Sequence, residues 1–415
     1  MFPMSATSRA GKSAGGRGFS TGRWKSRVRE LPEVMGEFPV ATLADEIETP
    51  GEGQVRALLT IMGNPALSTP DSGRLEAALE DLEFMVSVDI YCNETTRHAD
   101  VILPPPSLLE RGHCDTSFAN LSVRNVINYS PPVFEPTGPT EANILARLAL
   151  VLGGQGAQAD PALIDSMLLG GLLESHAANP DSALHGQGVD ELAAEQEGRP
   201  GPEALLDIML RAGPYGEDSE ESAEPLSLER LEDNPHGIDL GPLLPRVPAV
   251  LSTPSARIEL MTDALAGELD RLDQALAAAT TEGLLLVGRR HLRSNNSWKH
   301  NDPSLVSGQD RCTLQMHPEA AAERGLEHGD LADLASRVGR VRAPVEITGD
   351  IMPGVVSLPH GWGHDQPCVR MQTAASQPGV NSNTLTDGEM LDNLSGNAVL
   401  NGIPVVVEAC SPSRG

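Results

Sequence analysis

The sequence contains few cysteines. It has five cysteines in 415 residues, an odd number, and no two of them are separated by only two residues. Because an iron–sulfur cluster requires several thiolates brought together by closely spaced ligands, we expect this chain to ligate no cluster. An odd, scattered set is also unlike a disulfide framework, so we expect reduced cysteines and an intracellular, cytoplasmic location.

Long apolar runs, aromatic residues and positive charge are also scarce. No run of about 18 apolar residues is present, so we expect no membrane span. Aromatic residues make up 3% of the chain, and 30 Lys and Arg face 58 Asp and Glu, a net charge of −28. This charge opposes nonspecific binding to nucleic acid or to anionic membranes. Any anionic ligand must therefore be held by local donors.

Glycine and proline are abundant, with 41 and 33 residues, and 40% of the chain is hydrophobic. This composition predicts aliphatic cores joined by many structured loops, in two or three domains. Residues 1–35 are predicted to be a flexible basic start, because they are rich in Arg, Gly and Ser and lack the apolar middle of a secretory signal.

Residues 36–156 show an alternation of strand and helix patterns. An apolar run at 57–62 ends at a turn signal, a helix capped by Ser72 follows, and further strands are predicted at 84–90 and 101–103. This is the pattern of a Rossmann-like α/β domain with a parallel sheet. A second helix, capped by Thr140, is predicted to place Ile144, Leu148, Val151 and Leu152 on one face.

The remainder divides into two parts. Residues 157–280 are predicted to be a helical and linker region that completes the α/β part, with a solvated acidic run at 217–224. Residues 281–415 carry five short strand candidates, at 284–287, 331–335, 341–347, 354–358 and 404–407, and one helix at 318–324. That spacing predicts a compact C-terminal β-barrel.

Two groups of polar residues follow predicted strands in the first half. Gly63 and Asn64 form a turn at a strand end, where glycine permits close backbone approach and asparagine both donates and accepts hydrogen bonds. Farther along, Asp89 can bind a guanine edge or ribose hydroxyls, and Thr95 and Thr96 can bind phosphate. The alternative is equally open: Asp89 and Asp100 can be simple caps.

A basic and amide-rich segment, residues 288–301, follows the first strand of the predicted barrel. It contains Arg289, Arg290, Asn295 and Asn296. Guanidinium groups match phosphate oxygens, so a local positive patch in an acidic chain indicates a pyrophosphate site. The alternative is an exposed loop that balances acidic neighbours.

Two later loops supply further candidates. His360 and His364 are four residues apart, but Pro359 and the intervening glycines indicate a loop, so a metal bound by these histidines is not expected. Trp362 can cover a planar ring, whereas Asn383 and Thr386 can contact polar edges of a heterocycle. Each loop taken alone is equally compatible with an ordinary turn.

Taken in order, these motifs resemble the molybdopterin oxidoreductases of the dimethyl sulfoxide reductase superfamily, which includes formate dehydrogenases and nitrate reductases. The resemblance also includes Glu110-Arg111-Gly112 and Thr253 to Leu260. It implies that the α/β domain contacts the guanosine part of one pterin dinucleotide and that the barrel closes over both. The cofactor implied is molybdenum bis-molybdopterin guanine dinucleotide. The residues assigned to it by likeness are Gly63, Asn64, Asp89, Thr95, Thr96, Asp100, Arg289, Arg290, Asn295, Asn296, His360, Trp362, Asn383 and Thr386.

The chain also departs from the family pattern. Family members begin with a region that usually holds a four-iron cluster and the Cys, selenocysteine or Ser ligand of molybdenum, and neither is recognisable here. The resemblance thus implies an N-terminally truncated member or one half of a split enzyme. It would act on a small substrate such as formate or nitrate, with a redox partner subunit or a missing N-terminal half.

Two alternatives stay open at this point. The first is a noncatalytic binding or structural remnant that lacks the iron–sulfur and molybdenum-ligand region. The second is an unrelated two-domain α/β nucleotide binder. Guanosine binding without pterin would favour the latter.

Overall fold

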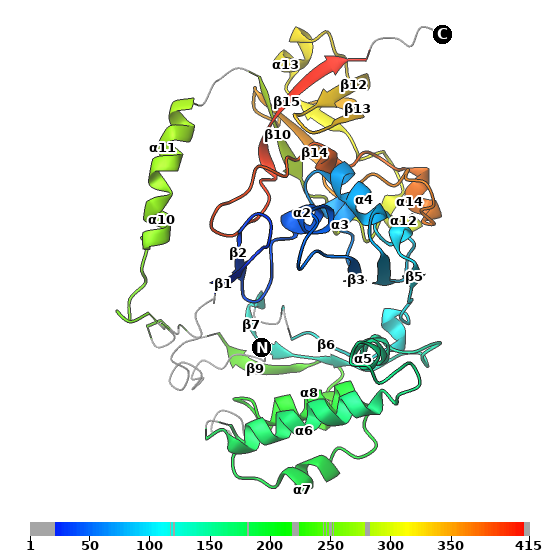
Figure 1. The fold of residues 1–415 in the computed structure, drawn as a ribbon, viewed down its shortest axis with the longest axis vertical. Helices are drawn as coiled ribbons and strands as arrows, with labels where there is room; N and C mark the ends of the chain where they lie inside the picture. Colours follow the sequence, from blue (N-terminus) through cyan, green and yellow to red (C-terminus); the bar gives the residue numbers. More distant parts are fainter. Residues whose placement is uncertain are drawn as a thin grey trace. The chain divides into compact units, whose positions relative to one another are not determined.

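The computed structural model describes residues 21–410 apart from 117, 119–120, 181, 218–223, 244, 246, 249–250, 252 and 279–282. Most of the predicted basic start and of the predicted acidic run lies outside these residues. The chain forms two compact units. One comprises Phe19–Pro104 and Met261–Gly415, and the other comprises Met1–Gly18 and Pro105–Leu260. Figure 1 gives the element labels used below. The four-part division made from the sequence stays a prediction.

A three-stranded parallel sheet forms one part of the first unit. Its order is β3 (Ala57–Ile61), β4 (Phe84–Val88) and β5 (Val101–Ile102). The crossovers contain α3 (Pro65–Ser68), α4 (Ser72–Glu80) and the 3-10 turn η2 (Thr96–His98). Helix α2 (Leu43–Glu48) packs with α4 around a buried apolar cluster that includes Ile47, Leu75, Leu79 and Met85. This confirms the α/β class with a parallel sheet.

The start of α4 differs from the prediction. Ser72 is the first helical residue and not the cap, because the capping position belongs to Asp71, whose φ is 51° and whose side chain makes no capping hydrogen bond. The hydroxyl of Ser72 instead lies 3.2 Å from that of Thr384. The left-handed conformation of Asp71 turns the chain sharply into the helix.

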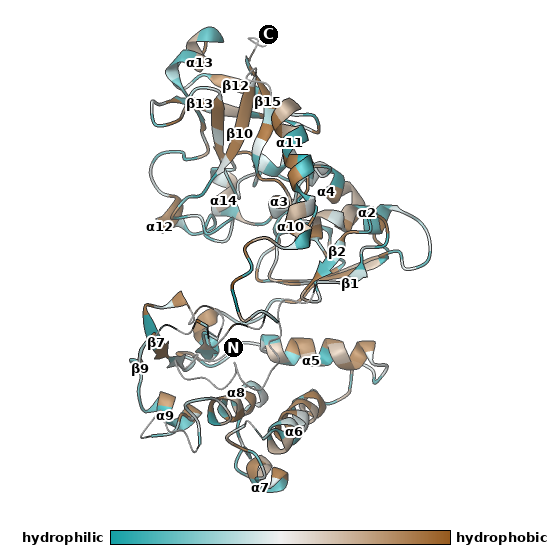
Figure 2. Ribbon diagram, turned by 90° about the vertical axis from the view of Figure 1, so that its left-hand side faces the viewer, coloured by the Kyte–Doolittle hydropathy of each residue, from teal (hydrophilic) through white to brown (hydrophobic). Residues whose placement is uncertain are grey.

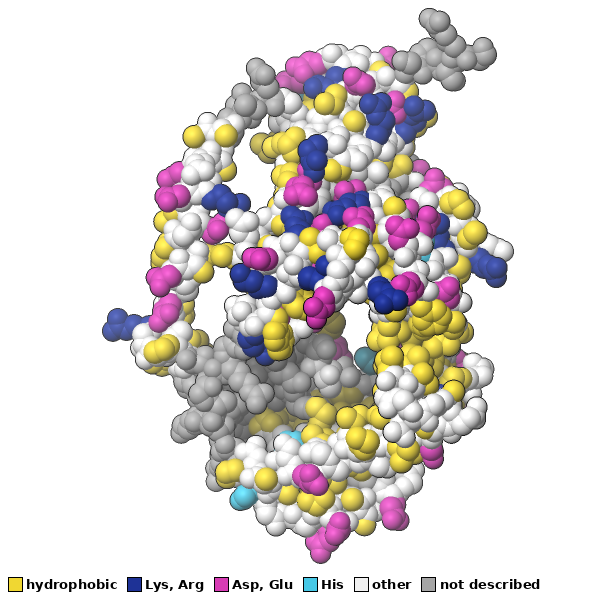
Figure 3. Space-filling model, in the orientation of Figure 1, with side chains coloured by type: hydrophobic (Ala, Val, Ile, Leu, Met, Phe, Trp, Pro, Cys, Tyr) yellow, Lys and Arg dark blue, Asp and Glu magenta, His cyan; other side chains and the backbone are white. Residues whose placement is uncertain are grey.

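Ion pairs cover the outer face of α2 and α4. Arg74 contacts both Asp45 and Glu48 at 2.7 Å, and Arg29 lies 3.8 Å from Asp45. Figure 3 shows blue and magenta side chains next to one another over this region. Two antiparallel strands, β1 (Thr21–Lys25) and β2 (Pro32–Val34), precede α2.

A closed six-stranded barrel forms the other part of this unit, as predicted. Its strand order is β10-β14-β11-β13-β12-β15. The bounds are β10 Leu284–Arg289, β11 Leu314–Met316, β12 Leu331–Ala335, β13 Arg340–Ile347, β14 Val355–Pro359 and β15 Asn401–Ala409. Alternate residues point inward, and the core is aliphatic, with Leu314, Leu334 and Leu358 fully buried. Figure 2 shows hydrophobic colour along β10, β12 and β13.

Short helices lie in the loops between the barrel strands. The predicted helix at 318–324 is α13 (Pro318–Glu323), and α12 (Pro303–Val306), α14 (Gln372–Ser376) and the turn η5 (Ser382–Thr384) lie in the loops. Strand β11 was not predicted, because three residues are too few to display an alternating pattern. Helices α10 (Asp263–Gly267) and α11 (Leu269–Ala278) contain no buried residue.

The second unit is mainly helical. It contains the helices α5 (Glu141–Leu152), α6 (Ala162–Ala178), α7 (Val189–Ala194), α8 (Gly201–Arg211) and α9 (Leu228–Glu232). Two small antiparallel sheets join β6 (His113–Cys114) to β8 (Tyr129–Ser130), and β7 (Arg124–Ile127) to β9 (Ile238–Pro242). A further 3-10 turn, η3, spans Leu108–Glu110.

Helix α5 has the predicted cap but not the whole predicted face. The Thr140 hydroxyl accepts a hydrogen bond from the Asn143 amide, as expected for an N-cap. Ile144 is buried, whereas Val151 and Leu152 are 47% and 82% exposed. Val151 and Leu152 therefore lie away from the core on which Ile144 and Leu150 pack. No helix among the described residues is both long and apolar enough to cross a lipid bilayer.

Candidate functional site

The turn after β3 is built around Asn64. Its side-chain amide donates to Glu94 Oε2 at 2.8 Å, and its Oδ1 accepts from the Thr95 hydroxyl at 2.7 Å. The Thr95 hydroxyl in turn accepts from the backbone amide of Ala66 at 3.0 Å. Thr95 is fully buried, so its hydroxyl stabilises the junction between two strand ends of the sheet.

The turn after β4 has a similar internal network. Asp89 accepts from the Tyr91 amide at 2.9 Å and from Asn93 Nδ2 at 3.2 Å. The Thr96 hydroxyl donates to the Tyr91 carbonyl and accepts from the Asn93 amide, both at 2.8 Å. Burial raises the pKa of Asp89 against the effect of these hydrogen bonds. Asp100 accepts from the Met85 amide at 2.8 Å. Asp89 thus closes the turn in its own loop and Asp100 binds the backbone of β4, and neither bond is a helix cap.

Arg289, at the end of β10, donates hydrogen bonds to backbone carbonyls of other barrel segments. Its guanidinium donates to the carbonyls of Ser357 at 3.1 Å and Thr313 at 3.0 Å, with a longer contact to Arg311. Burial lowers its pKa. Arg289 is not among the residues that line the neighbouring pocket, so the structure separates it from Arg290, which follows it in the sequence.

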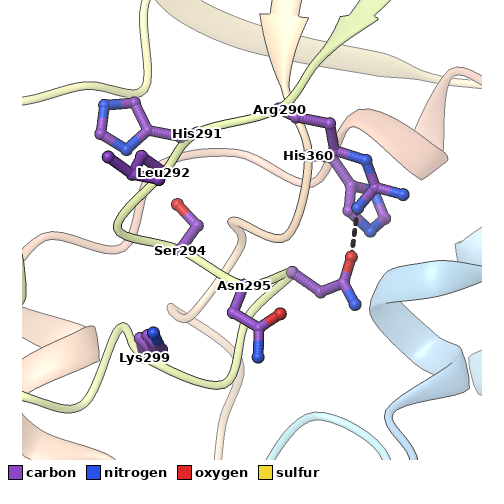
Figure 4. A pocket seen from close by; sticks show the side chains of 8 residues that line it. Arg290, His291, Leu292, Ser294, Asn295, Lys299 and His360 are labelled. Atoms are coloured by element: carbon purple, nitrogen blue, oxygen red, sulfur yellow. Dashed lines mark hydrogen bonds between the residues drawn. The ribbon is translucent and has the colours of Figure 1, made fainter. Parts of the chain in front are cut away.

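That pocket has a volume of about 410 Å³ and opens beside the loop after β10. Figure 4 shows Arg290 beside His360. The Arg290 guanidinium donates to the Asn296 side-chain oxygen. Asn295 and Asn296 have φ angles of 44° and 57°, a left-handed conformation that reverses the loop at the pocket. Burial, followed by the charge of Arg290, lowers the pKa of His360. The lining residues are Arg290, His291, Leu292, Ser294, Asn295, Asn296, Lys299 and His360.

Asn383, Thr386 and Trp362 are buried inside the unit, whereas Gly63 is half-buried. Asn383 Nδ2 donates to the Leu67 carbonyl at 2.6 Å, and the Thr386 hydroxyl donates to Asn383 Oδ1 at 3.0 Å. Trp362 is 2% exposed and stacks on His300, with ring centroids 4.0 Å apart. Gly63 forms the turn before Asn64. The structure thus places Arg290, Asn295, Asn296 and His360 at one pocket, and the others in internal contacts.

Segments from the sheet and the barrel meet directly. Asn381 Nδ2 donates to the Ala66 carbonyl at 3.0 Å, and the Arg370 amide donates to the Cys92 carbonyl at 2.9 Å. Glu94 Oε1 accepts from His364 Nδ1 at 2.8 Å, and His364 Nε2 lies 2.8 Å from His300 Nδ1. The loops that follow β4 and β10 are therefore connected by one chain of hydrogen bonds.

Sequence reasoning missed the three side chains of this connection. Glu94 lay inside the polar segment after β4, His300 inside the basic loop, and His364 was considered only as a metal ligand. No group of three or more His, Cys, Asp or Glu side chains is arranged to hold a metal ion within the described part of the chain. Lys299 and Ser294 were missed as pocket residues, although both belong to the basic segment that was singled out.

Two family models of molybdopterin proteins match this chain. Residues 284–404 match the molydopterin dinucleotide binding domain, and residues 4–138 match the molybdopterin oxidoreductase family model. The chain therefore belongs to the molybdopterin oxidoreductases of the dimethyl sulfoxide reductase superfamily, which confirms the resemblance seen in the sequence.

Several curated relatives are similar over most of the chain. The trimethylamine-N-oxide reductase of Haemophilus influenzae is 24% identical over 361 residues, which cover 79% of this chain and 40% of the relative. The dimethyl sulfoxide/trimethylamine N-oxide reductase of Rhodobacter capsulatus is 24% identical, with coverage of 79% and 39%. The F420-dependent formate dehydrogenase subunit alpha of Methanocaldococcus jannaschii is 25% identical, with coverage of 77% and 40%. The chain spans about 40% of the length of these relatives.

A solved structure has the same fold. Acetylene hydratase from Pelobacter acetylenicus aligns with a TM-score of 0.53 at 20% identity, and the alignment covers 90% of this chain and 46% of the other. At this identity the likeness concerns the fold alone.

Proposed function

We propose that this chain binds the guanine dinucleotide part of a bis-molybdopterin cofactor and serves as part of a molybdenum-dependent oxidoreductase. The observation that carries this proposal is the pocket after β10, which lies within the segment matched by the dinucleotide-binding model. It gathers the cations Arg290 and Lys299 beside His360 in a chain whose net charge is −28. Such a cluster suits the negative charge of a pyrophosphate.

The donor set fits a dinucleotide. Arg290 offers a planar guanidinium and Lys299 an ammonium group for phosphate oxygens. Asn295, Asn296 and Ser294 supply groups that can both donate and accept hydrogen bonds. Because Arg290 donates to the neutral side chain of Asn296, an incoming phosphate can exchange this partner for a charge-assisted one.

The polar residues that follow β3 and β4 support the cofactor site indirectly in this proposal. Asn64, Thr95 and Thr96 hold the ends of β3 and β4 in fixed turns through their mutual hydrogen bonds. The half-buried Gly63 and the exposed Asp100 are left to contact the guanosine of a second dinucleotide. Asn383 and Thr386 fix the barrel loop against Leu67.

When bound, the molybdenum held by pterin dithiolenes supplies two-electron redox chemistry. The polypeptide positions the cofactor and neutralises its phosphates. The substrate in this proposal is a small molecule such as formate, nitrate, or an N-oxide or S-oxide of the kind named for the relatives. A redox partner subunit belongs to the same proposal.

GDP binding tests the phosphate site. We expect the purified chain to bind GDP in a calorimetric titration and Arg290→Ala to weaken binding about 10- to 100-fold, since a charge-assisted hydrogen bond contributes about 1.5–3 kcal/mol. Arg293→Ala is the matched control, because Arg293 is an exposed cation of the same loop that does not line the pocket.

The control should change GDP affinity by less than about threefold, since its charge acts only through solvent. Equal losses for the two variants would mean that the loop acts through overall charge and not as a site. Absence of GDP binding by the folded wild-type chain would refute the proposed dinucleotide function.

A further inference from the structure

Three buried side chains form an unbroken hydrogen-bonded series. Glu94 and the His364 side chain are fully buried, and His300 is 2% exposed. Glu94 Oε1 lies 2.8 Å from His364 Nδ1, and His364 Nε2 lies 2.8 Å from His300 Nδ1. We call this series the Glu–His–His chain. His300 Nε2, at its far end, is buried and has no hydrogen-bond partner among the residues that the structure describes.

The two short contacts restrict where the protons reside. A carboxylate only accepts hydrogen bonds, so His364 must carry a proton on Nδ1. If His364 is neutral, its Nε2 is an acceptor and His300 must donate from Nδ1. His300 Nε2 is then a bare lone pair, buried without a donor, which is an unfavourable state.

Binding one proton removes this unsatisfied lone pair on His300 Nε2. A proton on His300 Nε2 allows the Nδ1 proton of the same ring to transfer to His364 Nε2. His364 then becomes an imidazolium that donates to Glu94 from one nitrogen and to the vacated His300 Nδ1 from the other. One N–H bond forms at His300 Nε2, one breaks at His300 Nδ1 and one forms at His364 Nε2, so the net change is one bound proton.

We propose that the Glu–His–His chain is a proton-uptake site that receives a proton at His300 Nε2 and stores the positive charge on His364 against the Glu94 carboxylate.

The electrostatics of the series support this distribution of charge. Burial raises the pKa of Glu94, but the hydrogen bond and charge of His364, together with the Asn64 amide, outweigh burial and leave that pKa lowered. Burial and the charge of His364 lower the pKa of His300 to about 3, whereas the backbone of Gly361 opposes this shift. The outer ring is thus unfavourable for charge.

Few other ionisable groups among the described residues interact with the Glu–His–His chain. Glu76, Cys92 and Arg97 interact electrostatically with one another or with Glu94, and His291 interacts with His300. Arg97 also pairs with Glu76 at 3.3 Å, so these two charges largely compensate each other. Glu94 is therefore the anion that directly contacts the histidine pair.

Both histidines of the Glu–His–His chain are close in the sequence to residues that line the pocket. Lys299 precedes His300 and lines the anion pocket, and His360 lines the same pocket four residues before His364. A proton on His364 adds a reversible positive charge beside a pocket suited to anions. Proton uptake itself does not depend on the identity of the pocket's ligand, so it stands or fails separately from the dinucleotide proposal.

Nitrogen NMR of the folded chain labelled with 15N-histidine tests the proposal without a variant. In alkaline solution we expect both rings to be neutral with the proton on Nδ1. On acidification, and before the chain unfolds, His364 should become protonated on both nitrogens while His300 stays neutral and moves its proton to Nε2. Single His300→Gln and His364→Gln variants assign the signals.

A second measurement examines the role of Glu94. Glu94→Gln should lower the pH midpoint of proton uptake by about one to three units, since it removes an opposite charge in direct contact. Glu319→Gln, which changes a 77% exposed carboxylate on α13, should leave the midpoint unchanged. An imidazolium at His300, absence of proton uptake before unfolding, or an unchanged midpoint in folded Glu94→Gln would each overturn the proposal.

Discussion

Gly361 joins the pocket loop to the barrel, and replacing it with alanine tests the packing at this point. Its φ is +91°, and a Cβ atom would lie 2.3 Å from the Asn296 carbonyl oxygen and 2.5 Å from its carbon. Both atoms are backbone, so the contact cannot be relieved by a side-chain rotation. The loop that carries Asn296 would have to move away from Gly361.

The magnitude has two parts. A non-glycine residue in a left-handed conformation costs about 1–2 kcal/mol, and forcing extra volume into a packed contact costs about 1–3 kcal/mol. We therefore expect Gly361→Ala to lose about 2–5 kcal/mol of unfolding free energy. Gly354→Ala is the matched control, since Gly354 has φ +80° and open space within 4 Å of its Cβ position. The control should lose only about 1–2 kcal/mol.

Urea unfolding monitored by tryptophan fluorescence makes the comparison, because Trp24, Trp298 and Trp362 all belong to the unit that contains the barrel. We also expect weaker GDP binding by Gly361→Ala, since Asn296 lines the pocket. If the two variants unfold at the same urea concentration, the close approach of Gly361 to the loop does not contribute to stability and the packing argument is wrong.

Three further expectations concern buried polar groups of the same unit. Arg289→Met should lower the unfolding free energy by about 2–4 kcal/mol in urea titrations, because the carbonyls of Ser357 and Thr313 lose their donor; a neutral effect would show that these bonds are dispensable. Asn383→Ala should lose about 1–3 kcal/mol, since the buried Leu67 carbonyl is left unpaired, and calorimetric melting that matches wild type would contradict this. Because the pKa of His300 is lowered to about 3, the unfolded chain binds a proton that this ring does not bind in the folded chain once the pH falls below about 6.5. The unfolding free energy should therefore decrease by about 1.4 kcal/mol between pH 7.5 and pH 5.5 because of this residue. His300→Gln should remove this contribution to the pH dependence of the unfolding free energy. An unchanged pH dependence in the variant would show that the ring is not held neutral in the folded chain.

Local patterns in the sequence were sufficient for much of the fold. The apolar run at 57–62 and the strand candidate at 341–347 depend on neighbours within one element, so strands β3 and β13 were predictable. The cap at Thr140 is equally local. Strand β11 has only three residues, and the cap of α4 depends on the left-handed backbone of Asp71, so neither left a readable pattern.

For the site, the residue types were visible but their partners were not. The basic segment after β10 predicted the donors of the pocket, because charge and amide content are properties of the sequence itself. The contact between Glu94 and His364 spans 270 positions, and that between Asn383 and Leu67 spans 316. No periodicity links residues at such separations, so their pairing depends on how the sheet and the barrel pack.

The sequence by itself determined the class of the fold, the family and the location of the polar loops, since these follow from composition, period and motif order. The tertiary structure alone decided that Arg289 binds barrel carbonyls while Arg290 lines a pocket. It also decided which nitrogen of each buried histidine faces a carboxylate or another ring. The physical reason is that hydrogen bonds depend on distance and direction between individual atoms, which are set only when distant segments are packed together.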